Sequence, residues 1–409
     1  MVSAEKVDSY SKYVDYDNGL IDRKIMSDPE IYKQEMERIF ARAWLFLCHE
    51  SQIPNAGDFF QTYMGEDRVI VSRARDMSIN VLLNTCPHRG NMVCRQDSGN
   101  TSSFMCAYHG WTFDSSGSLI GLPGSKGLFH GTLDREKWGL RRAAQVESYN
   151  GFIFATLDPK APTFHDYLGP AGRFSMDAFT DYGELEVIPG VIKHRVPCNW
   201  KMAMENTTDY YHVSVAHVAA LNLMGVFELL EEDMERPGVV ILGDYGHVAD
   251  ATTHDGPVRH VNIFPNALGF VETYQSFIVR HPRGPMETEM WYFSLVDKNA
   301  TPEHRESIRL RAARNLGPAG LIEQEDAENW ELSSKASQST AMRRSALNYQ
   351  MGLGHGTVRD DGVTPYARID DEPIANDHYM RWGYRSWAEW MDADDWPMLE
   401  QIRTNPGEA

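Results

Sequence analysis

The sequence predicts an α+β fold, with a small all-β domain followed by a larger domain in which helices flank an antiparallel sheet. The first observation is a group of short segments that alternate or run apolar between turn residues, at 59–72, 78–83 and 146–155. The second is a later series of strand-like segments that would form a larger antiparallel sheet, at 185–197, 239–243, 258–265, 269–279 and 287–296. The third is a pair of helical segments after them, at 301–316 and 321–336.

Three parts are expected along the chain. Residues 1–40 are expected to form an N-terminal helical segment that joins the larger domain. Its helix begins at Ser27-Asp28-Pro29, where a capping side chain precedes a proline of the first turn. Residues 41–158 form the small β domain. The Pro-rich stretch 158–162 resembles a linker, so the larger domain takes residues 159–409.

Clear stop and start signals bound the helices of the larger domain. Thr301-Pro302 begins one helix, and Gly317-Pro318 ends it. A second helix follows and is rich in acidic residues. The segment 384–391 is aromatic and amphipathic and is expected to pack against the sheet or a neighbouring subunit.

Charge and composition exclude several classes of partner. The chain has 409 residues and a formal net charge of −19, which argues against nucleic acid and anionic membranes. No apolar run approaches the length of a membrane span, and the first ten residues are too polar for a signal peptide. Five scattered cysteines fit a reducing compartment, so we expect a cytoplasmic protein.

The β region contains a strong metal motif. Cys86-x-His88 and Cys106-x-x-His109 each supply one thiolate and one imidazole from a loop that also carries a glycine. Such mixed pairs are typical of a Rieske [2Fe–2S] cluster, in which two thiolates hold one iron and two imidazoles hold the other. The competing interpretation is zinc in a Cys2His2 site, although zinc fingers pair Cys with Cys and His with His. Cys48, Cys94 and Cys198 are expected to be structural.

A second candidate metal site lies between Asn199 and His217. Within thirteen residues this stretch holds Glu205, Asn206, Asp209, His212 and His217. If the stretch is helical, Asp209 and His212 lie one turn apart, and the helix must bend for His217 to reach the same ion. Two histidines and one carboxylate leave a face of ferrous iron open. A histidine pair on a helix is more often a surface or core feature, and the upstream motif is what favours a metal here.

The missing carboxylate is expected from the acidic helix 321–336. The candidates that it offers are Glu323, Glu325, Asp326, Glu328 and Glu331, most of which are expected to form a solvated face. A cluster and an open iron in one chain imply that the cluster supplies electrons to an iron that activates O2.

At this point the chain resembles the large (α) subunits of the Rieske non-haem iron aromatic-ring-hydroxylating dioxygenases. The resemblance covers nearly the whole chain. It rests on the two Cys/His loops, Asn199-Trp-Lys, Glu205-Asn206-x-x-Asp209-x-Tyr-His212 with His217, Glu325-Asp326 with Trp330, and the segments 19–23 and 35–44.

The resemblance implies a role for each motif residue. Cys86, His88, Cys106 and His109 hold the cluster of a Rieske domain (41–158), and His212, His217 and Asp326 hold mononuclear Fe(II) in a catalytic domain (159–409). Asp209 matches a carboxylate that links an iron-ligand histidine to a cluster histidine of a neighbouring subunit. Asn206 matches a polar residue beside the iron.

The implied activity is a terminal oxygenase that adds both atoms of O2 to an aromatic ring and forms a cis-dihydrodiol. Electrons come from NADH through a reductase, with or without a ferredoxin, and the assembly is α3, or α3β3 with a small β subunit. A Rieske monooxygenase or demethylase would use the same metals. A rival from another class is an electron-transfer protein or a zinc-stabilised binding module, which the chain length and the Asp209, His212, His217 set disfavour.

One departure from the family pattern concerns the substrate, an aromatic acid or an aromatic hydrocarbon. Only Thr207 and Thr208 separate Asn206 from Asp209, which is similar to the benzoate, aminobenzoate and salicylate branches rather than the naphthalene and biphenyl types. An aromatic acid would need a cation in the pocket, and several arginines lie between 236 and 314. The apolar residues that could line a ring pocket are Val213, Leu221, Leu223, Met224, Phe227 and Leu230.

Overall fold

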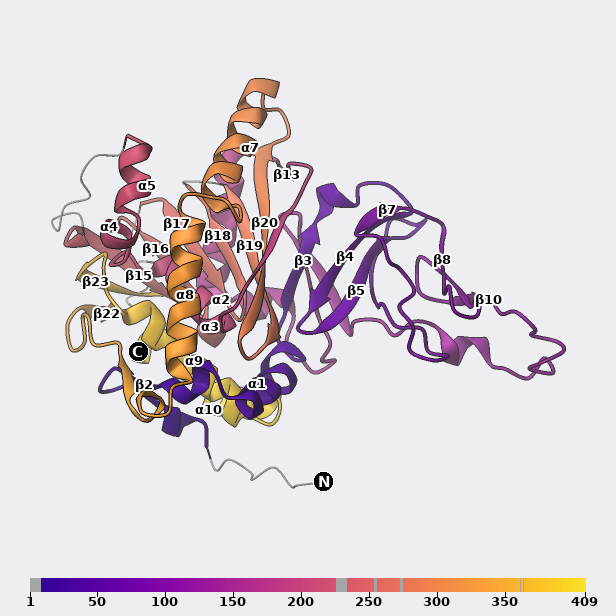
Figure 1. The fold of residues 1–409 in the computed structure, drawn as a ribbon, viewed down its shortest axis with the longest axis horizontal. Coiled ribbons are helices and arrows are strands. Elements are labelled where there is room, and N and C mark those ends of the chain that lie inside the picture. Colours follow the sequence, from indigo (N-terminus) through magenta and orange to yellow (C-terminus); the bar gives the residue numbers. More distant parts are fainter. Residues whose placement is uncertain (1–8, 226–233, 254–255, 273–274, 361, 363) are drawn as a thin grey trace. The chain divides into compact units, whose positions relative to one another are not determined.

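The computed structural model describes residues 9–225, 234–253, 256–272, 275–360, 362 and 364–409. The chain forms two compact units, one from residues 40–161 and the other from residues 1–39 and 162–409. The sequence placed the corresponding boundaries after residues 40 and 158. Figure 1 shows the sheets of the first unit in violet, the N-terminal part of the second unit in indigo, and the large sheet and later helices of the second unit from magenta to yellow.

The smaller unit is all-β with three antiparallel sheets. The expected strands at 59–83 and 146–155 are confirmed. The four-stranded sheet has the order β6-β5-β4-β7, from Ile79–Leu83, Asp67–Arg73, Asp58–Met64 and Ser98–Asn100. Two three-stranded sheets complete the unit, β10-β9-β8 (Leu119–Gly121, Thr112–Asp114, Ser103–Met105) and β11-β12-β3 (Gln145–Tyr149, Phe152–Thr156, Leu45–His49).

The larger unit is built on a ten-stranded antiparallel sheet within the described residues. The order is β13-β20-β19-β18-β17-β16-β15-β23-β22, and β14 also pairs with β20. In chain order the strands are β13 Leu185–Val187, β14 Ile192–Val196, β15 Pro237–Leu242, β16 Val248–Ala251, β17 Val258–Ile263, β18 Ala267–Phe270, β19 Ser276–Gly284, β20 Glu287–Asp297, β22 Thr357–Arg359 and β23 Ala367–Pro373.

The prediction of one strand over 269–279 is wrong. β18 ends at Phe270, and β19 begins at Ser276 and runs antiparallel to it. Residues 273 and 274 between these strands lie outside the described part of the chain, and the sequence of 271–275, Val-Glu-Thr-Tyr-Gln, has no glycine or proline to mark a break.

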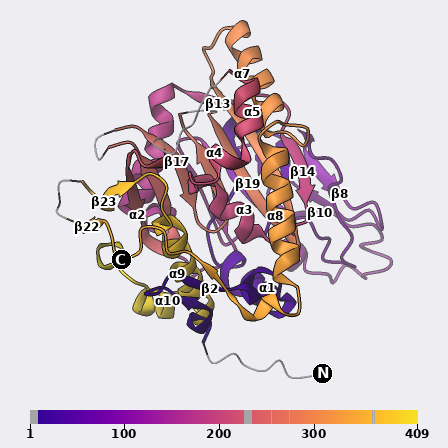
Figure 2. The same cartoon turned by 60° about the vertical axis from the view of Figure 1, so that its left-hand side comes forward.

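Helices cover both faces of this sheet (Figures 1 and 2). Gly269 and Phe277 contact Phe179, which lies just after α2 (Phe164–Asp177). Because successive side chains in a strand point to opposite faces, Leu268 and Ile278 face the other side, where α8 (Glu323–Ser337) crosses the sheet in Figure 1. Other helices of this unit include α1 (Pro29–Glu35), α3 (Trp200–Glu205), α7 (Pro302–Leu316), α9 (His378–Asp392) and α10 (Trp396–Ile402).

A buried ion pair joins the N-terminal segment to the helix that leads into the histidine-rich stretch. Glu35 of α1 lies 2.5 Å from Nζ of Lys201 and accepts hydrogen bonds from the indole N–H groups of Trp200 (2.9 Å) and Trp387 (2.8 Å). Both charged side chains are fully buried, and burial lowers the pKa of Lys201. The Asn-Trp-Lys motif therefore anchors α3 to α1.

Lys201→Met is expected to destabilise the protein, because it leaves the Glu35 carboxylate buried without its counter-ion. The expected loss is about 3–5 kcal/mol of unfolding free energy, measured as a lower thermal midpoint. Lys335→Met, which removes an exposed lysine paired with Glu331, is the matched control and should change the midpoint little. Equal midpoints for the two variants would contradict this account.

No helix in the described part of the chain is both long and apolar enough to cross a membrane.

Candidate metal centres and active-site cavity

The stretch from Asn199 to His217 is helical only in part. After α3 a short turn covers 206–208, and the backbone is extended at Asp209 (φ −86°, ψ 93°). α4 (Val213–Ala216) follows, and His217 (φ −100°, ψ 12°) separates it from α5 (Val218–Leu223). These breaks provide the bend that the spacing of His212 and His217 requires.

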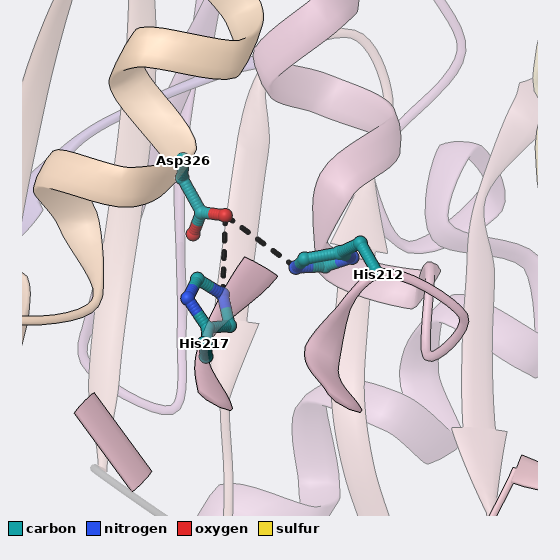
Figure 3. Close-up of side chains that lie close together, drawn as sticks. All are labelled: His212, His217 and Asp326. Atoms are coloured by element: carbon teal, nitrogen blue, oxygen red, sulfur yellow. Dashed lines mark ion pairs between the residues drawn. The ribbon is translucent and has the colours of Figure 1, made fainter. Parts of the chain in front are cut away.

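Three side chains converge at this bend, as Figure 3 shows. Oδ1 of Asp326, from α8, lies 3.4 Å from Nε2 of His212 and 3.1 Å from Nε2 of His217. One candidate ligand atom from each residue lies within 4.8 Å of the other two. Two imidazole nitrogens and one carboxylate oxygen form the donor set that suits ferrous iron with open positions.

Further carboxylates face the other nitrogen of each imidazole. Oδ2 of Asp209 lies 3.2 Å from Nδ1 of His212, and Oε2 of Glu325 lies 2.9 Å from Nδ1 of His217. Although burial lowers the pKa of His217, the carboxylates of Asp326 and Glu325 outweigh it and raise that pKa. Glu325 holds Nδ1 of His217, and Asp209 lies beside Nδ1 of His212 without a hydrogen bond to it. Each imidazole presents Nε2 to the same point, so the residues fit a mononuclear iron.

Glu325→Ala is expected to weaken iron binding about 10- to 100-fold, because Nδ1 of His217 loses the group that orients the ring. The measurement is iron retained per chain at equilibrium with a graded chelator. Glu328→Ala removes an exposed carboxylate of the same helix and should retain iron like the unmodified protein. Equal retention by the two variants would show that Glu325 does not position His217.

The two Cys/His loops have the same backbone conformation. The N–H of Gly90 donates to the carbonyl of Cys86, and the N–H of Gly110 donates to the carbonyl of Cys106, both at 2.9 Å. Both glycines have φ of 71°, a left-handed conformation that other residues rarely adopt. A sequence repeat of Cys, His and Gly therefore becomes a repeated loop shape.

The side chains of these loops lie together. The imidazole centroids of His88 and His109 are 4.5 Å apart, and Cys86 and Cys106 are buried free thiols. The amide of Asn91 donates to Sγ of Cys106 at 3.6 Å, the kind of donor that tunes a metal-bound sulfur. Two thiols, two imidazoles and a donor to sulfur fit a [2Fe–2S] cluster.

Comparison with known proteins assigns each unit to a family. Residues 43–139 match the Rieske [2Fe-2S] domain. Residues 166–239 and 246–353 match the ring hydroxylating alpha subunit (catalytic domain). The alpha subunit of benzene 1,2-dioxygenase from Pseudomonas putida is 35% identical over 94% of this chain and 94% of its own length.

The chain belongs to the ring-hydroxylating dioxygenase α-subunit family. The alpha subunit of biphenyl 2,3-dioxygenase from Rhodococcus jostii (strain RHA1) is 34% identical over 98% of this chain and 95% of the relative. Naphthalene 1,2-dioxygenase with indole bound has a TM-score of 0.87 at 29% identity and covers 96% of this chain and 97% of that one. The family resemblance, the α+β fold and the enzyme class expected from the sequence are thus confirmed.

The cofactors follow from the family. This α subunit is a terminal oxygenase component that uses a Rieske [2Fe–2S] cluster and a mononuclear iron, with O2 as co-substrate. When bound, a cluster held by Cys86, His88, Cys106 and His109 would supply single electrons, and an iron held by His212, His217 and Asp326 would supply open positions for O2.

A cavity of about 280 Å³ lies between α8 and the sheet, beside His212, His217 and Asp326, which we call the triad. Most of the strand side chains that line it lie on one face of the sheet, namely His260, Leu268, Phe270, Ile278, Arg280, Met290 and Tyr292, and Arg259 also lines it. Of the expected ring-pocket residues, Val213 and Leu221 line the cavity. Leu223 does not, because 77% of it is exposed, and Met224 is absent from the lining. Phe227 and Leu230 fall outside the described residues.

Two polar residues of the 199–217 stretch take separate positions. Asn206 lines the cavity beside the triad. Glu205 does not join the triad. It is buried, accepts hydrogen bonds from the hydroxyls of Tyr349 (2.8 Å) and Tyr384 (2.7 Å), and burial raises its pKa to about 7.

Sequence reasoning missed a polar network at the cavity wall. The hydroxyl of Tyr210 donates to Oδ2 of Asp250 (3.0 Å) and lies 2.6 Å from Nδ1 of His260. Nδ1 of His260 is 2.9 Å from Oδ1 of Asp250, and Nε of Arg259 donates to Oδ2 at 3.2 Å. Asp250 and His260 lie opposite each other on neighbouring strands, so only the sheet register reveals the pairing.

Proposed function

We propose that this α subunit dihydroxylates an aromatic ring to a cis-dihydrodiol at the triad. The residues with proposed roles are His212, His217 and Asp326 as iron ligands, Cys86, His88, Cys106 and His109 as cluster ligands, and Asn206 and Asp209 as polar residues beside the iron. The observation that carries the proposal is the position of the triad at the wall of a largely aliphatic and aromatic cavity.

In the proposed reaction both atoms of O2 form bonds to adjacent ring carbons. NADH is oxidised to NAD⁺, and two electrons and two protons complete the diol. The apolar side chains of the cavity hold the ring and exclude water. Asp326 and the two imidazoles lie on one side of the cavity and face the ring. Electrons enter through a reductase, with or without a ferredoxin, as in other multicomponent oxygenases.

We infer that Asp209 connects two subunits. One of its oxygens, Oδ2, faces Nδ1 of His212, and the side chain retains 27% exposure, which leaves a carboxylate edge within reach of a neighbouring chain. A carboxylate held between an iron-ligand imidazole and a cluster imidazole would be a short path for electrons. This proposal requires a trimer, α3 or α3β3, and placement of the chain in the cytoplasm with its reductant.

The relatives and the sequence spacing favour different classes of substrate. The relatives described above are named for benzene, biphenyl and naphthalene, whereas the short spacing between Asn206 and Asp209 favours an aromatic acid. Both classes place a ring against the same cavity wall.

A single turnover with ¹⁸O2 tests the function. The iron-loaded, reduced protein is mixed with a panel of aromatic acids and hydrocarbons, and products are weighed by mass spectrometry. Two labelled atoms in one product are expected. One labelled atom, or a lost methyl group, would assign the chain to the monooxygenases or demethylases. No product from protein with both metal sites filled would contradict activity on simple aromatics.

A further inference from the structure

Arg280 brings a buried positive charge to the wall of the cavity. It lies on β19, where Ile278 and Arg280 point to the cavity face and pair with Tyr292 and Met290 of β20. Only 1% of Arg280 is exposed. A cation in this position is unexpected for a pocket that would hold only an uncharged hydrocarbon.

The guanidinium of Arg280 lacks a counter-ion among the described residues. Nη2 donates to the hydroxyl of Thr207 at 2.6 Å, and Nε and Nη1 have no hydrogen-bond partner there. The acidic Glu323 is also buried, but its Oε1 accepts from the hydroxyl of Tyr292 and lies 3.2 Å from Nε2 of His194. The charge of Glu323 acts on Arg280 but forms no ion pair with it. Because a buried charge is costly unless it is paired, an anion in the cavity would stabilise Arg280.

The other buried arginine of the cavity wall is already neutralised. Nε of Arg259 donates to Asp250 at 3.2 Å, and its guanidinium lies 4.6 Å from the ring centroid of Tyr210. Burial lowers the pKa of Arg280 to about 10, so Arg280 remains a cation near neutral pH. Of the two buried arginines in the described cavity wall, Arg280 is therefore the one without an ion pair, whereas Arg236, which also lines the cavity, is exposed.

We propose that Arg280 binds a carboxylate of the substrate, so that the ring which this cavity presents to the triad belongs to an aromatic acid. This inference rests on the proposed function, because it names the substrate class of the same site. Nη1 of the planar guanidinium has no partner among the described residues and can donate a charge-assisted hydrogen bond to a carboxylate oxygen. The hydrogen-bond partner of Arg280, Thr207, is one of the two residues that separate Asn206 from Asp209. The 206–208 turn therefore connects Arg280 with the polar residues beside the triad.

Binding to the iron-loaded holoenzyme tests the inference without turnover. Calorimetry measures Kd for benzoate, 1-naphthoate and biphenyl-4-carboxylate, each beside its neutral primary amide of the same shape. The unmodified protein should bind each acid more tightly than its amide. Arg280→Met should weaken binding of the acids about 10- to 100-fold, the range of a charge-assisted hydrogen bond, and leave the amides unchanged. Arg280→Lys should retain part of the preference.

Two control variants separate substrate binding from a structural role. Arg283→Met removes a cation from the same strand outside the cavity lining, and Arg195 remains near its partner Glu289. It should bind acids normally. Thr207→Val removes the hydroxyl that holds Arg280. If Arg280 only supported the 206–208 turn, then Thr207→Val and Arg280→Met would weaken acids and amides equally, which would overturn the proposal.

The outcomes for the substrate class and for the function are distinct. If the unmodified protein binds acids no better than amides, the inference fails, even when hydrocarbons give products with two labelled atoms. If acids bind through Arg280 and yet no aromatic compound gains two labelled atoms, the anion site stands and the proposed function fails. Should Arg280→Met not fold, the acid-to-amide ratio of the unmodified protein and of Arg280→Lys decides the matter.

Discussion

Asp209→Ala is expected to lower steady-state turnover by at least about 100-fold while both metal centres stay occupied. The reason is that Asp209 donates no ligand to the triad, yet it faces Nδ1 of His212 and keeps an exposed edge for a neighbouring subunit. Without it, reduced cluster and iron would exchange electrons slowly. Stopped-flow absorbance should show the reduced cluster being reoxidised slowly after O2 and substrate are added.

Metal content and a conservative variant make this test specific. Iron per chain and the electron paramagnetic resonance spectrum of the cluster should match those of the unmodified protein. Asp209→Asn keeps an acceptor for the N–H of His212 without the charge and should recover part of the rate. Full turnover by Asp209→Ala would show that the electron route does not pass through this carboxylate.

Asp326→Ala is expected to abolish product, a loss of at least about 10³-fold, because the proposed iron site loses the one carboxylate of the triad found among the described residues. Iron bound at the mononuclear site should become nearly undetectable after dialysis, since two imidazoles alone hold ferrous iron weakly. The cluster spectrum should be unchanged, because Cys86, His88, Cys106 and His109 all lie in the other unit.

The neighbouring acids of α8 serve as controls for Asp326. Glu331→Ala removes a carboxylate that pairs with Lys335 and should keep both iron and activity. Asp326→Glu keeps the charge on a longer side chain and should bind iron with altered affinity. If Asp326→Ala retained iron and activity, Glu325 or a residue outside the triad would have to be the carboxylate ligand.

Much of the fold was predictable because its signals are local. Proline and capping residues bounded α7, and apolar alternation identified most strands of both units. The break between β18 and β19 escaped prediction because residues 271–275 include no glycine or proline. The bends around Asp209 and His217 were implied only by the requirement that two imidazoles meet.

The sequence by itself determined the chemistry of the two metal centres. Each Cys/His loop and the His212–His217 pair is encoded within a few residues, where spacing and glycine conformation decide which donors can meet. The tertiary structure decided which acid faces the histidines, that Glu325 orients His217, and that Arg280 borders the cavity. These residues lie on strands and helices far apart in the chain, and sheet register and helix packing bring them together, neither of which a short sequence pattern records.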